Sequence, residues 1–296
     1  MRARGSLQSC LVTIVMALAG FVTAGALPAV AAPSTYPYVA LGDSYAAGTA
    51  SQQDGCPHGP VNYPALLGSG RIVLTDNVAC SGAKIQAGSN PLGTQLSALN
   101  GSGTRLVTLT VGAANLGLSA VLDACLATPP VNCGPEIARA QGVLGVCGGE
   151  SPLGGLLINL YGEAAKAAPR ARIVVTGYPL LFESPADTDP DRIAKTAINK
   201  ATTDLNCVIE RAVAAANDAD ANIHYVDVTE EFARHGIVDP RSCNRSAFIH
   251  SLVNCDPPPP QDPEAFHPTA AGYRAYAEAI KTKLPNGWLD KQDPSV

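Results

Sequence analysis

The pattern of apolar and polar residues divides the chain into strand-like and helix-like segments. Short apolar runs, one of which (105–111) alternates with polar positions, predict four strands at residues 38–41, 105–111, 172–176 and 223–228. Apolar residues recurring at three-and-four spacing predict three long helices at residues 154–168, 192–216 and 269–284. Strands that alternate with helices over one domain predict a three-layer α/β/α arrangement around a mostly parallel sheet.

Two segments lack either periodicity and are predicted as loops. Residues 125–152 and 239–263 are rich in glycine, proline and cysteine, and the second contains a run of four prolines that no helix or sheet interior accepts. We expect disulfides to hold these loops in place.

The first residues have the pattern of an export signal. Arg2 and Arg4 precede a mostly apolar stretch, Leu11–Ala26, and Ala29–Ala31 offers a small-x-small cleavage pattern. The sequence therefore predicts a signal peptide over residues 1–32 and a single exported domain over residues 33–296. No later apolar run reaches the length of a transmembrane helix, so a secreted, extracellular protein is expected.

Cysteine usage agrees with an oxidising compartment. Eight of the nine cysteines follow the predicted signal peptide, an even number without any C-x-x-C pair. Eight cysteines allow about 105 pairings. Closure of short loops favours three pairs and leaves the last two cysteines for each other: Cys56–Cys80, Cys125–Cys133, Cys243–Cys255 and Cys147–Cys207.

The charge of the chain argues against a nucleic-acid partner. The formal net charge is −5 and becomes −7 without the two signal-peptide arginines, and no cluster of lysine or arginine stands out.

A serine follows the first predicted strand, within GDSY at Gly42–Tyr45. Glycine, aspartate and serine are common in turns and helix caps, so the triplet alone is also compatible with an ordinary turn. At the carboxyl end of a strand and the start of a helix, however, the N–H of Ser44 would point toward an oxyanion formed by attack of its hydroxyl.

A histidine near the other end of the chain is the candidate base. His267 lies in EAFHPTAAGY, with Glu264 three residues before it and Asp262 slightly farther along the same loop as a competing carboxylate. A carboxylate that binds one ring nitrogen leaves the other free to accept the serine proton. The other histidines have contexts typical of structural or surface positions, and no H-E-x-x-H occurs, so no metal or other cofactor is predicted.

Four segments together resemble the SGNH/GDSL hydrolases, particularly the secreted actinobacterial esterases and lipases, over essentially the whole mature chain. They are GDSY at 42–45, ACSGAKI at 79–85, TLTVGAANLGL at 108–118 and EAFHPTAAGY at 264–273. The resemblance implies a single flavodoxin-like domain with Ser44 as nucleophile and His267 as base. It also implies that the backbone N–H groups of Ser44 and Gly82 bind the oxyanion.

The chain departs from the family pattern in two blocks. Where the third block usually has an asparagine that donates to the oxyanion, this chain has Ala114, and Asn115 could take that role only if the loop shifts by one residue. In the last block Glu264 stands where aspartate is usual. Some relatives orient the histidine with a backbone carbonyl, so Glu264, Asp262 and a carbonyl remain alternatives.

These features predict a secreted, monomeric serine esterase or lipase that hydrolyses carboxylic esters through an acyl-enzyme on Ser44. The alternative is a hydrolase-like binding or cell-surface protein that lost strong catalysis through Ala114. The resemblance allows acyl lipids, phospholipids, polyesters or acetylated glycans as substrates. An aromatic content of only 5% favours acyl esters over glycans, since few rings are available to stack on sugars.

Overall fold

The computed structural model describes residues 35–48, 56, 58–86, 91–101, 103–127, 132–217, 222–253, 255, 264–285 and 287. Contacts divide the chain into residues 1–32 and residues 33–296. The predicted signal peptide lies outside the described residues and stays a prediction. All features below belong to the second unit.

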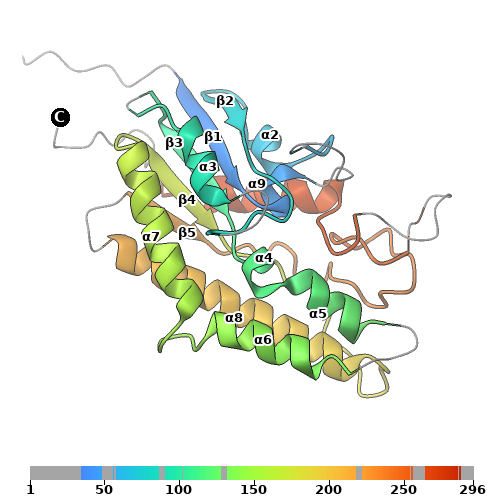
Figure 1. The fold of residues 1–296 in the computed structure, drawn as a ribbon. Coiled ribbons are helices and arrows are strands. Elements are labelled where there is room, and N and C mark those ends of the chain that lie inside the picture. The colour runs from blue at the N-terminus through green and yellow to red at the C-terminus, as the bar shows by residue number, and fades with distance from the viewer. Residues whose placement is uncertain are drawn as a thin grey trace, which may run out of the picture. The chain divides into compact units, whose positions relative to one another are not determined.

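The described strands form one five-stranded sheet in the order β2-β1-β3-β4-β5, and every neighbouring pair is parallel (Figure 1). The strands are β1 (Tyr36–Gly42), β2 (Ile72–Asn77), β3 (Leu106–Thr110), β4 (Arg172–Thr176) and β5 (Ile223–Val226). The four predicted strands correspond to β1, β3, β4 and β5, and the predicted α/β class is confirmed.

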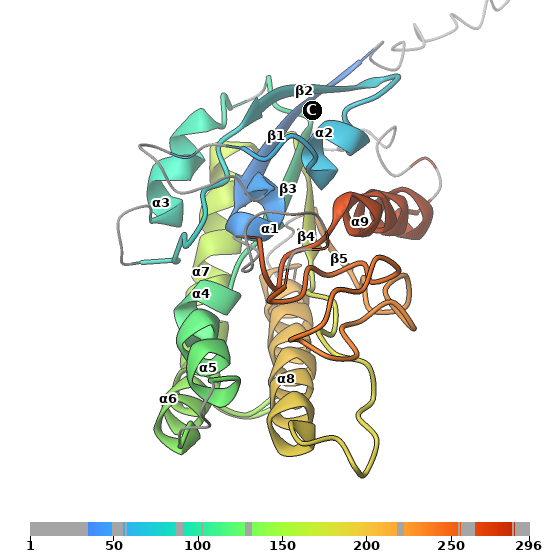
Figure 2. The ribbon, with the colours of Figure 1, turned by 90° about the vertical axis from the view of Figure 1, so that its right-hand side faces the viewer.

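Helices cover both faces of the sheet. In Figure 2, α2 (Tyr63–Leu67) and α9 (Ala270–Lys283) lie on one side of the strands, and α7 (Pro152–Ala167) lies on the other. Helix α8 (Arg192–Asn217) packs against α7. The three predicted helices correspond to α7, α8 and α9. The shorter elements are α1 (Ser44–Ala47), α3 (Leu92–Gln95), the 3₁₀ turn η1 (Leu96–Ala98), α4 (Ala113–Leu116), α5 (Leu118–Cys125) and α6 (Gly134–Leu144).

Two elements contradict the sequence-based expectations. Strand β2 was not predicted, because this edge strand has the sequence IVLTDN, in which no position is fully buried. The segment 125–152 is not wholly a loop, since it contains α6, which turns Ala140 and Leu144 inward. Glycine, proline and cysteine around this helix hid its three-and-four spacing. The described part of 239–263 contains no helix or strand, as expected.

The order of the strands fixes where a site can form. The chain runs from β1 outward to β2, then returns past β1 to β3, β4 and β5. Connections therefore leave the carboxyl ends of β1 and β3 toward opposite faces of the sheet. Connections that diverge in this way leave a crevice at the carboxyl ends of the two strands, and ligands of parallel sheets bind in such crevices. The residues that follow β1 and β3 are therefore the expected site.

All four predicted disulfides are confirmed. They join Cys56–Cys80, Cys125–Cys133, Cys147–Cys207 and Cys243–Cys255. The first bond is placed just ahead of Gly82 in the chain, and the third ties the loop before α7 to α8. The cross-links therefore anchor loops rather than the sheet.

Buried hydroxyl groups connect neighbouring strands beneath the carboxyl edge of the sheet. The hydroxyl of Tyr63 lies 2.8 Å from that of Thr110, which lies 2.6 Å from that of Thr176. Thr176 in turn lies 3.1 Å from the hydroxyl of Tyr276, whose ring stacks on that of Tyr63 at 4.8 Å. Each polar group is thus paired inside the core, which removes the cost of burying it alone.

Candidate active site

The turn after β1 presents Ser44 at the first position of α1. Asp43 caps this short helix, accepting a 3.0 Å hydrogen bond from the N–H of Tyr45. Gly42 has φ of 141°, and a Cβ there would lie 2.4 Å from the carbonyl oxygen of Thr110. The turn therefore needs glycine both for its backbone angle and for its close approach to β3.

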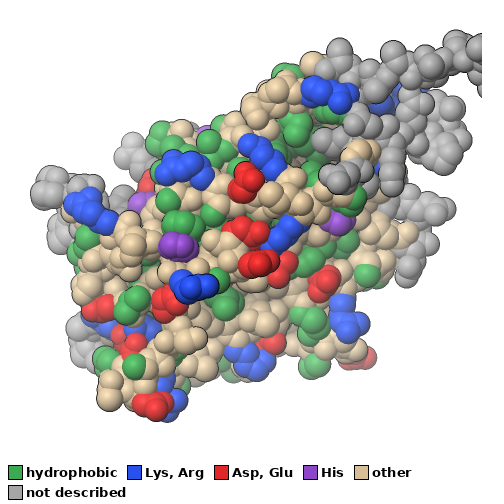
Figure 3. All heavy atoms as spheres, turned by 180° about the vertical axis from the view of Figure 1, so that it is seen from behind, with side chains coloured by type: hydrophobic (Ala, Val, Ile, Leu, Met, Phe, Trp, Pro, Cys, Tyr) green, Lys and Arg blue, Asp and Glu red, His purple; other side chains and the backbone are tan. Residues whose placement is uncertain are grey.

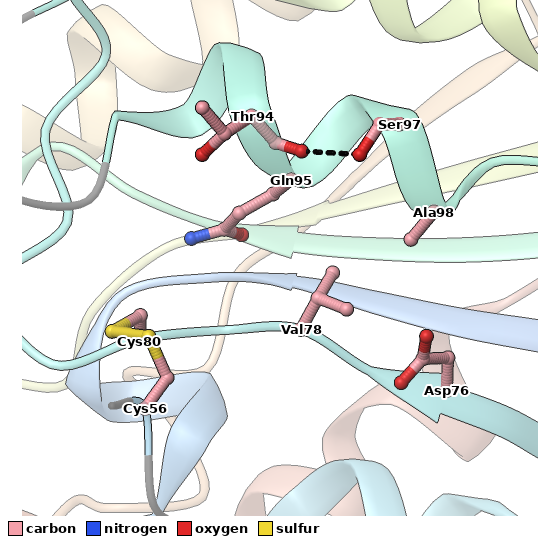
Figure 4. Close-up of a pocket in the computed structure, with 8 residues that line it drawn as sticks. All are labelled: Cys56, Asp76, Val78, Cys80, Thr94, Gln95, Ser97 and Ala98. Carbon is pink, nitrogen blue, oxygen red and sulfur yellow. Dashed lines mark hydrogen bonds between the residues drawn. A yellow bond between two sulfur atoms is a disulfide. The ribbon is translucent and has the colours of Figure 1, made fainter. Parts of the chain in front are cut away.

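A glutamine from α3 clamps this turn. Gln95 accepts a hydrogen bond from the N–H of Gly42 at 2.8 Å and donates to the carbonyl of the same residue at 2.9 Å. Figure 4 shows Gln95 pointing from α3 toward the neighbouring strands. Sequence reasoning missed this residue, because nothing local marks a contact between positions 53 residues apart.

The histidine from the C-terminal block meets the serine. Nε2 of His267 lies 2.8 Å from Oγ of Ser44, and Nδ1 lies 3.1 Å from the carbonyl oxygen of Ala265. This pair of contacts fits the tautomer with its proton on Nδ1, which leaves Nε2 to accept a proton from the hydroxyl. Both side chains are partly exposed, so a substrate could reach them.

The structure describes one of the two carboxylates proposed to orient His267. The carboxylate of Glu264 lies 3.4 Å from Nε2 of His250, a histidine of the neighbouring loop. Asp262 lies outside the described residues. Nδ1 of His267 contacts the carbonyl oxygen of Ala265, which is a group of the third kind among the alternatives left open by the sequence.

A tyrosine next to the serine holds the histidine loop. The hydroxyl of Tyr45 donates a 2.7 Å hydrogen bond to the carbonyl of Phe266, directly before His267. The rings of Tyr45 and His267 lie 5.4 Å apart. On its other side the loop is tied to His250, which exchanges backbone hydrogen bonds with Phe266 and His267 at 2.8 and 2.9 Å. Local sequence patterns do not indicate these bonds.

The second and third blocks converge beside the serine turn. Cys80, just before Gly82, donates its N–H to the carbonyl of Gly42 at 3.0 Å. Gly82 is exposed and has φ of 74°. The side-chain oxygen of Asn115 accepts a 3.2 Å hydrogen bond from the N–H of Ile85, which ties the third block to the second. Among the described residues, no hydrogen bond occupies the N–H of Ser44 or Gly82.

Asp43 is a buried carboxyl beside this site. Burial raises its pKa to about 6, while hydrogen bonds from the Tyr178 hydroxyl and the Tyr45 N–H act in the opposite direction. Its described contacts are with these donors and with the backbone of β3, so it shapes the turn rather than contacting the Ser44 hydroxyl.

Comparison with known proteins places this arrangement in a family. The sequence profile described as GDSL-like Lipase/Acylhydrolase family matches residues 40–275, a span that includes every block discussed above. The chain belongs to this GDSL family. It is an ester hydrolase of the GDSL type.

Relatives with the same architecture occur in Streptomyces. The chain is 31% identical to Lipase 1 of Streptomyces coelicolor over 92% of this chain and 94% of the relative. Among solved structures, phospholipase A1 of Streptomyces albidoflavus is 31% identical with a TM-score of 0.66. The extracellular lipase of Streptomyces rimosus is 27% identical with a TM-score of 0.65. The chain covers 100% of each of these two structures, which in turn cover 84% of it.

A cavity of about 350 Å³ lies beside α3 of this GDSL hydrolase, away from the serine and histidine. Its lining residues are Cys56, Asp76, Val78, Cys80, Thr94, Gln95, Ser97 and Ala98 (Figure 4). Gln95 lines this cavity and also binds the backbone of Gly42. The cavity therefore borders a residue that holds the serine turn in place, whereas Ser44 and His267 are not among its lining residues.

The described part of the GDSL hydrolase holds no group of three or more His, Cys, Asp or Glu side chains suited to a metal ion. Among the described helices, none combines the length and hydropathy that a bilayer span requires. On the face drawn in Figure 3, basic and acidic side chains are interspersed. The expected absence of nucleic-acid partners and the monomeric state stay predictions.

Proposed function

We propose that the chain is an exported serine esterase that forms an acyl-enzyme on Ser44. The 2.8 Å approach of His267 Nε2 to Ser44 Oγ carries the proposal, because it joins a hydroxyl to a base across 223 residues of sequence. The position of this pair, at the carboxyl edge of β1, is the expected place for a ligand in a parallel sheet.

The contacts suit a two-step hydrolysis. His267 removes the proton of Ser44 as Oγ attacks the ester carbonyl, and then returns that proton to the departing alcohol as the ester C–O bond breaks. Water, deprotonated by the same histidine, then attacks the acyl-enzyme, and His267 returns that proton to Oγ as the bond between Oγ and the acyl carbon breaks and the acid is released. The carbonyl of Ala265 accepts from Nδ1–H throughout, which keeps the ring oriented and stabilises its protonated form.

Backbone amides would hold the oxyanion. We assign this role to the N–H groups of Ser44 and Gly82, with the side-chain amide of Asn115 as the third donor. The support for Asn115 is its hydrogen bond to Ile85, which keeps it against the block that contains Gly82. Ala114, where the family usually has asparagine, has no polar side-chain group to offer.

Covalent capture tests the proposed mechanism. A fluorophosphonate ester, whose phosphorus imitates the tetrahedral intermediate, is expected to modify the purified protein once, and peptide mass spectrometry should locate the adduct on Ser44. Rapid mixing with a nitrophenyl ester should release a burst of nitrophenol equal to the enzyme concentration if deacylation is slower than acylation. Ester hydrolysis without modification of Ser44 would contradict the proposal.

Substitution of Asn115 tests the third donor. Asn115→Ala is expected to lower kcat by about 100- to 1,000-fold, the usual effect of removing one oxyanion donor. The matched change is Ala114→Asn, which should raise kcat little if Asn115 already supplies this bond. A large gain with Ala114→Asn and a small loss with Asn115→Ala would show instead that the hole has only two donors.

We also propose export of residues 33–296. Four disulfides in the described chain suit an oxidising compartment, and the relative from Streptomyces rimosus is an extracellular lipase. Protein recovered from culture medium should begin near Pro33. An N-terminus that still contains Arg2 and Arg4 would contradict cleavage.

We propose acyl esters as the substrate class. The relatives are lipases and a phospholipase A1, and the low aromatic content offers few rings for binding sugars. Higher kcat/KM for nitrophenyl acyl esters and phospholipids than for acetylated oligosaccharides is expected, and the reverse order would reject this class.

A further inference from the structure

One buried hydroxyl touches both turns that border the proposed site. The hydroxyl of Tyr178 donates a 2.6 Å hydrogen bond to Oδ2 of Asp43, directly before Ser44. The same oxygen accepts a 3.3 Å hydrogen bond from the N–H of Ala113, directly before Ala114. Tyr178 and Asp43 are each only 2% exposed, so water does not readily replace these bonds.

Tyr178 is itself fixed from outside the site. Its backbone N–H and carbonyl each pair with the side-chain amide of Asn206 on α8, both at 2.8 Å. The preceding residue, Gly177, donates to the carbonyl of Val226 at the end of β5 at 3.0 Å. The rings of Tyr178 and Tyr45 pack in a T-shaped arrangement with centroids 5.1 Å apart. The position of the hydroxyl is therefore set by β4, β5 and α8.

The two turns need a contact that fixes the distance between them. They follow the adjacent strands β1 and β3, which are in register at Gly42 and Thr110. Beyond that point the main chains separate into α1 and α4. The distance between the attacking oxygen and the oxyanion donors then depends on contacts outside the sheet. A misplacement of about 1 Å in such a site costs on the order of 100-fold in rate.

We propose that Tyr178 is a positioning residue for ester hydrolysis, which holds the turn carrying Ser44 and the turn leading to Asn115 at a fixed separation. This inference rests on the proposed role of Ser44 and concerns a residue that does not touch the substrate. Loss of the hydroxyl would leave the buried Asp43 carboxylate with one donor fewer and the Ala113 N–H without this acceptor.

The pKa of the Asp43 carboxyl provides a second test of the role of Tyr178. Its carboxyl has a pKa raised to about 6 by burial, and the bond from Tyr178 lowers that pKa. Without the hydroxyl, the pKa of Asp43 rises further. As the pH falls, the carboxylate that caps α1 is then protonated at a higher pH than in the parent protein. The titratable groups around this carboxyl come from α1, α2, the end of β4 and α9, and are Tyr45, Tyr63, Tyr178 and Tyr276.

The test compares two tyrosine-to-phenylalanine changes. Tyr178→Phe is expected to lower kcat by about 10- to 100-fold with KM for a short nitrophenyl ester nearly unchanged, and to move the acid limb of the pH profile to higher pH. Tyr161→Phe is the matched control, since the Tyr161 hydroxyl is buried on α7 and has no hydrogen-bond partner among the described residues. It should leave kcat and the pH profile unchanged.

The outcomes separate this inference from the proposed mechanism. A kcat for Tyr178→Phe within about twofold of the parent, with Ser44 still captured by the fluorophosphonate, would overturn the positioning role alone. Hydrolysis by all variants without capture at Ser44 would instead overturn the mechanism. If Tyr178→Phe does not fold, Asp43→Asn replaces it: this variant keeps the side-chain size and the acceptor for Tyr45. A tenfold or larger fall in its kcat supports the proposal, and an unchanged kcat overturns it.

Discussion

Replacement of Ser44 by alanine is expected to lower kcat for ester hydrolysis on the order of a million-fold, the usual effect of removing a serine nucleophile. The acyl-enzyme cannot form without Oγ, the hydroxyl oxygen that lies 2.8 Å from Nε2 of His267. Residual catalysis should come only from the oxyanion donors and substrate binding. Initial rates on a nitrophenyl ester, measured at high enzyme concentration, give the comparison.

Ser81 provides the control for this change. It lies in the second block beside Gly82, is partly exposed, and is likewise followed by a residue of the proposed site. Ser81→Ala should keep nearly the full rate and the fluorophosphonate adduct. Equal background rates for the parent protein and Ser44→Ala would end the serine mechanism.

The second large loss is expected from His267→Ala, again on the order of a million-fold in kcat near neutral pH. The serine hydroxyl is a weak nucleophile without a base, and Nε2 of His267 is the nitrogen placed 2.8 Å from it. Because hydroxide can partly replace a missing base, the remaining rate should rise with pH. Single-turnover measurements across a pH series would show this.

Glu264→Gln is the companion change, and it distinguishes the orienting groups. If the Ala265 carbonyl orients His267, neutralising Glu264 should alter kcat by no more than about threefold. If the carboxylate did so, a loss approaching 10,000-fold would be expected, as for an orienting aspartate in a triad. Thermal unfolding of the variant reports whether its contact with His250 matters for stability instead.

The strands and long helices were predictable because their signals are local. The runs at β1, β3, β4 and β5 are short, apolar and bounded by turn residues, and α8 keeps its spacing over 26 residues. Three cysteine pairs followed from the closure of short loops, and Cys147–Cys207 followed because these two cysteines were left. The encounter of Ser44 with His267 could be anticipated only because four separate segments matched one family pattern.

What the sequence did not reveal depends on long-range packing. Gln95, Tyr45 and Tyr178 contribute side chains to the site from ordinary local contexts, and their partners lie 53 to 221 residues away. Edge strand β2 carries too few buried positions to be recognised by its pattern. The periodicity of apolar residues indicates which face of a helix or strand is buried. It does not indicate which distant polar group forms a hydrogen bond with that element.

The hydrogen bond from the Tyr45 hydroxyl to the Phe266 carbonyl also affects when the protein becomes able to hydrolyse esters. Ser44 is synthesised 223 residues before His267, which lies directly ahead of helix α9. A nascent or truncated chain that stops short of this loop has the serine turn but no base beside it. Hydrolytic activity should therefore arise only after the chain has been synthesised beyond His267 and the loop that carries this histidine has docked beside the serine turn.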